Sequence, residues 1–93
     1  MPKIQRKKIG NQIVFYKITS TRQTSTSGTA KSGPATIIEK ETMGPKGKYN
    51  VYRSSISYSP YEKKWQLGNG WNLYKELNLK KATEAAKNAL KYL

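Results

Sequence analysis

The side chains best suited to binding chemistry in this sequence are aromatic rings interleaved with basic groups. They occur between positions 49 and 65, where four tyrosines and a tryptophan stand near arginine and lysine. An exposed ring can stack on an unpaired base while a neighbouring cation binds the phosphate backbone, a combination typical of single-strand binders. The rings have a competing role in the core, because Leu, Ile, Val and Phe supply only 16 of the 93 residues and rings bury large areas.

The charge balance points to a polyanionic partner. Lys and Arg number 18 against 5 acids, a net charge of +13, and the first 34 residues hold seven bases and no acid. Neutralised phosphates release counterions, so nucleic acid is the natural partner. Lys outnumbers Arg 15 to 3, which favours phosphate contacts over base reading or reflects coding bias in an A/T-rich genome. The candidate nucleic-acid-binding residues are Arg6, Lys7, Lys8, Arg22, Lys46, Lys48, Arg53, Tyr58, Tyr61, Lys63 and Lys64.

The composition excludes most catalytic and metal chemistry. Without Cys, His or Asp, the usual zinc, haem and iron–sulfur ligand sets and the Ser/His/Asp triad cannot form. Glu39 and Glu41 beside Lys40 are the minimum for a magnesium nuclease, but such nucleases usually offer an Asp, and cross-strand ion pairing is the ordinary explanation. We therefore expect no enzyme activity, no cofactor and no metal.

The chain carries no signal that directs it to a membrane or out of the cell. No apolar run approaches the length of a membrane span, and no apolar segment of a signal peptide follows the basic N-terminus. The absence of Cys suits a reducing compartment. We expect a cytoplasmic protein without membrane contact, in the host cytoplasm if the protein is viral.

The N-terminal third predicts a hairpin followed by a loop. Residues 4–8 and 12–18 are β-prone, and Gly10 and Asn11 between them favour a tight turn. The second strand is apolar on both faces, which indicates a central strand, while the charged first strand is typical of an edge. Residues 19–34 are rich in Ser, Thr and Gly without a large apolar side chain, and we expect a flexible basic loop there.

The rest of the chain predicts strands and one closing helix. Strands are expected at 35–42, 49–58, 64–67 and 71–77, and Asn78 is a plausible N-cap for a helix that starts at Leu79. The apolar stripe of this helix is Leu79, Ala82, Ala86, Ala89, Leu90 and Leu93. The fold class is α+β, a single domain over residues 1–93 in which four to six antiparallel strands pack against the C-terminal helix. If the helix covers the Ile56 face of its strand, the Arg53 face is exposed.

Trp65, Trp71 and the stripe from Leu79 to Leu90 belong to a run in which a Trp-bearing strand, a turn and a further strand lead to an Ala-rich helix. In this respect residues 51–93 resemble the three-strand-plus-helix DNA-binding module at the N-termini of tyrosine recombinases and in plant ethylene-response-type domains. In that family the sheet enters the major groove. The resemblance implies that the groove-facing groups are Arg53, Ser55, Ser57, Lys64 and Gln66.

These features together predict a non-enzymatic protein that binds nucleic acid, DNA ahead of RNA, through phosphates and with weak sequence specificity. The alternative is a small viral or phage protein whose basic surface docks on an acidic host protein. A ribosomal or ribonucleoprotein component shares the same composition. The sequence leaves open whether the target is single-stranded or double-stranded and whether the chain forms a homodimer.

Overall fold

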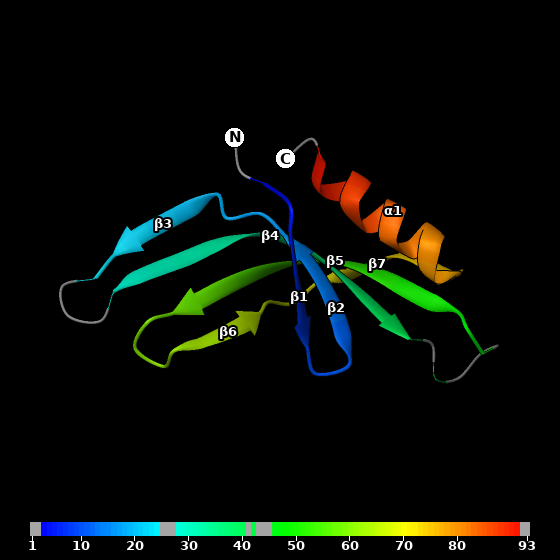
Figure 1. Cartoon of the computed structure of the whole chain (residues 1–93), viewed down its shortest axis with the longest axis horizontal. Helices are drawn as coiled ribbons and strands as arrows, with labels where there is room; N and C mark the ends of the chain where they lie inside the picture. The colour runs from blue at the N-terminus through cyan, green and yellow to red at the C-terminus, as the bar shows by residue number, and fades with distance from the viewer. Residues whose placement is uncertain (1–2, 25–27, 41, 43–45, 92–93) are drawn as a thin grey trace.

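Two long antiparallel strands form the spine of the molecule. The computed structural model describes residues 3–24, 28–40, 42 and 46–91. Strands β4 (Thr29–Lys40) and β5 (Tyr49–Ser59) pair along ten positions. Twelve residues at about 3.4 Å per residue span about 40 Å, which accounts for most of the 49 Å long axis of the molecule (Figure 1).

Two short strands lie one after the other along one side of the spine. Both β2 (Gln12–Tyr16) and β3 (Ser20–Gln23) pair with β4, and between them the Lys17 amide donates to the Pro34 carbonyl at 3.1 Å. A Cβ on Gly33 would collide with the Lys17 carbonyl. The chain therefore follows β4 through a bend that needs glycine on the facing strand.

The other side of the spine has the same arrangement. Strands β6 (Lys64–Leu67) and β7 (Trp71–Leu77) both pair with β5, and the Gly68 amide between them donates to the Ser55 carbonyl at 2.9 Å. A Cβ on Gly70 would collide with the Arg53 carbonyl. The sheet thus consists of two central strands flanked by two interrupted ones.

Strand β1 (Gln5–Ile9) completes the sheet as the outer partner of β2, in the order β1-β2-β4-β5-β6. The turn between β1 and β2 contains Gly10 at a φ of 60°. Val14, Phe15 and Tyr16 of β2 are buried, and they contribute to clusters on both faces. The predicted hairpin, its charged edge and its central second strand are confirmed.

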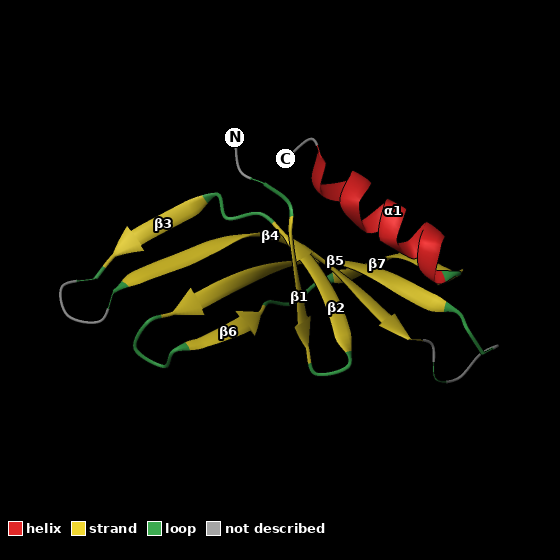
Figure 2. Ribbon diagram, in the orientation of Figure 1, coloured by secondary structure: helices red, strands yellow, loops and turns green. Residues whose placement is uncertain are grey.

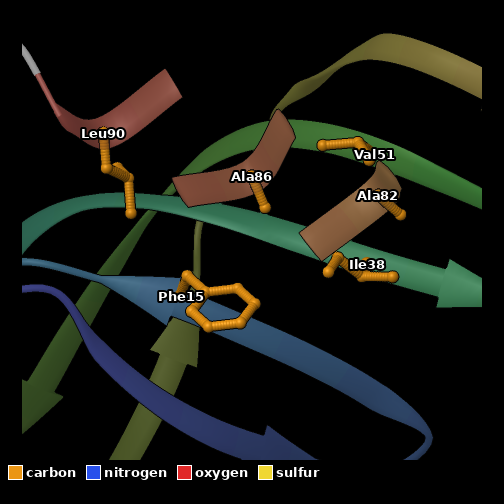
Figure 3. Close-up of a cluster of buried hydrophobic side chains, with 6 residues drawn as sticks. All are labelled: Phe15, Ile38, Val51, Ala82, Ala86 and Leu90. Atoms are coloured by element: carbon orange, nitrogen blue, oxygen red, sulfur yellow. The ribbon is translucent and has the colours of Figure 1, made fainter. Parts of the chain in front are cut away.

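Helix α1 (Leu79–Lys91) packs on one face of the sheet, against β2, β4, β5 and β7. The Lys81 amide donates to Asn78 Oδ1 at 2.8 Å, which confirms the predicted N-cap. Figure 3 shows Ala82, Ala86 and Leu90 of the helix together with the sheet side chains of this cluster, which are Phe15, Ile38 and Val51. Small alanines let the helix come close enough for the Thr36 hydroxyl to donate to the Ala86 carbonyl at 3.0 Å.

The predicted apolar stripe of the helix is confirmed at its centre and wrong at its start. Leu79 is 42% exposed, because it precedes the turn of the helix that first meets the sheet. Ala89 is half-buried, and Leu93 lies outside the described residues.

A second cluster, rich in rings, fills the opposite face of the sheet. Trp65 packs against Tyr16 and Tyr58 with ring centroids 5.6 Å and 5.0 Å away, and Lys7 Nζ lies 4.8 Å from the Trp65 ring centroid. Lys7 belongs to β1 and Trp65 to β6, which a flat sheet of this order would hold about 19 Å apart. The sheet must therefore curl around these rings, which cover a face that has no helix.

The α+β class with one C-terminal helix is confirmed (Figure 2). The loop expected over 19–34 is wrong for most of its length, since residues 20–23 form β3 and residues 29–34 belong to β4; residues 25–27 lie outside the described part. The helix covers the Val51 face of β5 rather than the Ile56 face. Arg53 therefore lies on the helix side of the sheet.

Candidate functional site

Helix α1 is too short to cover the sheet along its full length. Thirteen helical residues span about 20 Å, roughly half the length of the β4–β5 hairpin. Figure 1 shows β3, β6 and the adjoining halves of β4 and β5 extending beyond the helix. We call this four-stranded part the wing, and it comprises residues 20–23, 29–34, 54–59 and 64–67.

Small and basic side chains lie on the helix side of the wing. The pairing register places every second residue of each strand on this face, because side chains alternate along a strand. The set comprises Ser20, Arg22, Ala30, Ser32, Ser55, Ser57, Ser59, Lys64 and Gln66. The short side chains on β4 and β5 thus form a shallow floor. The longer side chains, Arg22, Lys64 and Gln66, stand on the outer strands β3 and β6.

This face is hollowed toward the tip of the wing. A hollow of about 550 Å³ is bordered by Arg22, Ala30, Ser57, Ser59 and Tyr61, among others. A second hollow of about 260 Å³ continues from it over the floor and shares Arg22 and Ser57. Together the two hollows form an open trough along the wing.

The charge around the trough is mainly positive. Arg22 on β3 and Lys64 on β6 are both exposed, and Lys63 is exposed in the preceding turn. Among the described residues that border the hollow, none is acidic. The nearby Glu62 accepts a hydrogen bond from Gln66 Nε2 at 2.9 Å. Three strand spacings of about 4.8 Å separate β3 from β6, and Arg22 and Lys64 stand on these two outer strands on the same face of the sheet.

Of the residues predicted from the sequence, Arg22, Tyr58 and Tyr61 border this hollow, and Lys64 pairs with Ser59 at its side. Tyr61 is 66% exposed. The Tyr58 ring instead packs against Trp65 on the opposite face. The structure therefore brings together the candidates from β3, β6 and the turn before β6.

The remaining candidates lie elsewhere. On β1, Lys7 lies over the Trp65 ring, on the face of the sheet without the helix. Arg6 and Lys8 lie on the opposite face, because their partners on β2 belong to the cluster under the helix. Exposed Lys46 and half-buried Lys48 belong to the β4–β5 connection, at the other end of the long axis from the wing tip. Arg53 is half-buried, and its Nη1 donates to the carbonyls of Ala35 at 3.2 Å and Ser54 at 2.9 Å.

Sequence reasoning found only part of the floor of the trough. Ser55 and Ser57 were among the groups that the family resemblance implied, whereas Ala30 and Ser32 fall in the expected loop over 19–34 and Ser59 lies beyond the expected end of its strand. A signal was present in the alternation of Ser55, Ser57 and Ser59 along β5, which marks a strand face without core residues. Strand β3, which pairs with β4, is exposed at every position and therefore carries no apolar periodicity.

Comparison of the chain with protein-family models, with curated proteins and with solved structures finds no match. The resemblance to the recombinase module stays a prediction. Over the described ranges, no helix combines the length and apolar character needed to cross a membrane. Within the same ranges, no group of three or more His, Cys, Asp or Glu side chains is placed to hold a metal ion.

Proposed function

We propose that this protein binds nucleic acid through the helix side of the wing, mainly by contacts to phosphates. The observation that carries the proposal is the trough itself, an uncovered floor of serines and alanine with Arg22 on one outer strand and Lys64 on the other. A low floor lets a sugar-phosphate backbone approach the sheet, and the flanking cations neutralise its charge.

The net charge of +13 supports the same proposal at longer range. A strongly positive surface raises the rate at which a polyanion meets the protein. Arg6 and Lys8 contribute to this attraction from β1, while Arg22, Lys63 and Lys64 make the close contacts. Two of these three residues are lysines, and a lysine is better suited to contacts with phosphates than to hydrogen bonds that read bases.

The test measures the affinity for a labelled oligonucleotide by fluorescence anisotropy as a function of salt. Three phosphate contacts give a slope of log K against log salt of about −2 on a single strand and about −3 on a duplex. We expect Lys64→Gln to reduce the slope by nearly one and to weaken binding about fivefold at 0.1 M salt.

Lys75→Gln is the matched control. Lys75 is an exposed lysine on β7, so it lies on the same interrupted side of the sheet as Lys64 but in the half that carries the helix. The slope for this variant should equal that of the parent protein. Equal losses in the two variants would contradict the wing as the site, and affinity indifferent to salt would refute nucleic-acid binding by phosphates. Stronger binding of an acidic polypeptide than of the oligonucleotide would instead favour a protein partner.

A further inference from the structure

The ring of Tyr61 is the feature of the trough that phosphate binding leaves unexplained. Tyr61 is 66% exposed and borders the 550 Å³ hollow at the tip of the wing. Tyr58 and Trp65, the other wing rings among the described residues, pack against each other. Tyr61 therefore keeps its ring surface available to a ligand.

The turn that carries Tyr61 is held in place by its neighbours. Pro60 is buried and borders the same hollow, and the Glu62 amide donates to Ser59 Oγ at 3.4 Å. Pro fixes one backbone angle next to Tyr61. The ring thus stands on a turn held by these contacts and borders the same hollow as Arg22, so one ligand in the hollow can meet both groups.

From this arrangement we propose that the wing selects single-stranded over double-stranded nucleic acid and stacks one unpaired base on Tyr61. The inference rests on the proposed function. The bases of an unpaired strand have free faces, and stacking on an aromatic side chain adds to the phosphate contacts whatever the base. In a duplex those faces are already stacked, and only the phosphate contacts remain.

The shape of the wing supports the same selection. Its outer strands lie about 14 Å apart before side chains are added, whereas the major groove of B-DNA is about 12 Å wide and admits a helix or a two-stranded ribbon. A four-stranded face is thus wider than the groove, and a regular duplex would meet it mainly through phosphates. The hollow of about 550 Å³ falls within the range of about 300–1,000 Å³ that accepts small organic ligands. This is the size class of a single nucleotide of an unpaired strand, and the hydroxyls of Ser57 and Ser59 border the hollow.

The experiment compares a labelled oligothymidine, an oligouridine and a blunt-ended duplex without unpaired bases, with the same number of phosphates per strand. We expect the single strands to bind more tightly than the duplex. Tyr61→Ala should weaken single-strand binding about five- to 150-fold, the effect of one lost stacking contact, and leave duplex binding unchanged. Tyr61→Phe keeps a ring and should keep the affinity. Preference for either single strand over the duplex supports the inference, and the two arms distinguish DNA from RNA.

Tyr74→Ala is the control, because Tyr74 is 50% exposed but lies on β7 beside the helix. Thermal unfolding of each variant verifies that it folds. Equal binding of duplex and single strands, or equal loss with Tyr61→Ala on both, would overturn the inference while the effect of Lys64→Gln upheld the proposed function. Absence of binding to all three probes would overturn both.

Discussion

At the scale of single residues, glycines determine where the flanking strands can bend. Gly33 lies opposite the bend between β2 and β3, and Gly70 lies between β6 and β7. At each position a Cβ would meet a main-chain carbonyl of the neighbouring strand, which cannot move aside as a flexible side chain can. These close contacts determine where the chain bends between β2 and β3 on one side of the spine and between β6 and β7 on the other.

We expect Gly33→Ala to lower the free energy of unfolding by about 3 kcal/mol, because the added methyl must displace the Lys17 carbonyl and its strand. Gly10→Ala is the comparison, since Gly10 has open space around its Cβ position and a φ of 60°. It should cost about 1 kcal/mol from the left-handed backbone alone. Urea unfolding followed by tryptophan fluorescence measures both. Equal losses would show that the bend tolerates a side chain.

Two candidate binding residues show how far a sequence can assign roles at this scale. Arg53 and Tyr58 stand in the basic and aromatic run, and their alternation along β5 correctly placed them on opposite faces. Their partners lie on the two neighbouring strands, β4 and β6. The Arg53 guanidinium reaches the Ala35 carbonyl, and the Tyr58 ring reaches Trp65. Such contacts are set by strand pairing, which local patterns do not specify.

At the scale of elements, α1 was the most predictable part of the chain, because its cap and its spacing of small apolar residues are local features. Asn78→Ala should lower the free energy of unfolding by about 1 kcal/mol, since the Lys81 amide loses its acceptor. Asn78→Ser retains a capping oxygen and should cost much less. Thermal denaturation followed by far-ultraviolet circular dichroism distinguishes the two. A similar loss in both variants would mean that the side-chain cap contributes nothing.

Strand β3 was the least predictable element. Its residues are Ser, Thr, Arg and Gln, all exposed, so neither apolar alternation nor burial marks it as a strand. It forms because the facing part of β4 offers unpaired backbone groups, which accept a second strand beyond the bend at Gly33. Pairing with a preformed neighbour here outweighs weak local preference.

At the scale of the whole molecule, the curl of the sheet brings its two edges into contact. Lys7 of β1 lies over the ring of Trp65 of β6, and an ammonium over an indole contributes about 0.5–1 kcal/mol at partly exposed sites. Lys7→Met keeps most of the side-chain bulk and should lower the free energy of unfolding by about that amount.

Lys8→Met is the control for this contact, because Lys8 points to the other face of β1. Its free energy of unfolding should stay within about 0.5 kcal/mol of the parent value. Chemical denaturation in matched buffers measures both variants. An equal effect at the two positions would show that lost charge, and not the contact with Trp65, accounts for the change.

The sequence by itself determined the α+β class, the helix and six of the seven described strands, the edge and central roles of β1 and β2, the helix cap and the concentration of positive charge. These properties are local, because side-chain alternation and capping depend on residues a few positions apart. Only the tertiary structure decided which face of β5 the helix covers and that half of the hairpin stays uncovered. The helix covers the face on which Phe15, Ile38 and Val51 pack against its alanines, and the uncovered half follows from fitting a helix of about 20 Å on strands of about 40 Å. That mismatch in length leaves the wing open and places Arg22, Lys64 and Tyr61 around one trough.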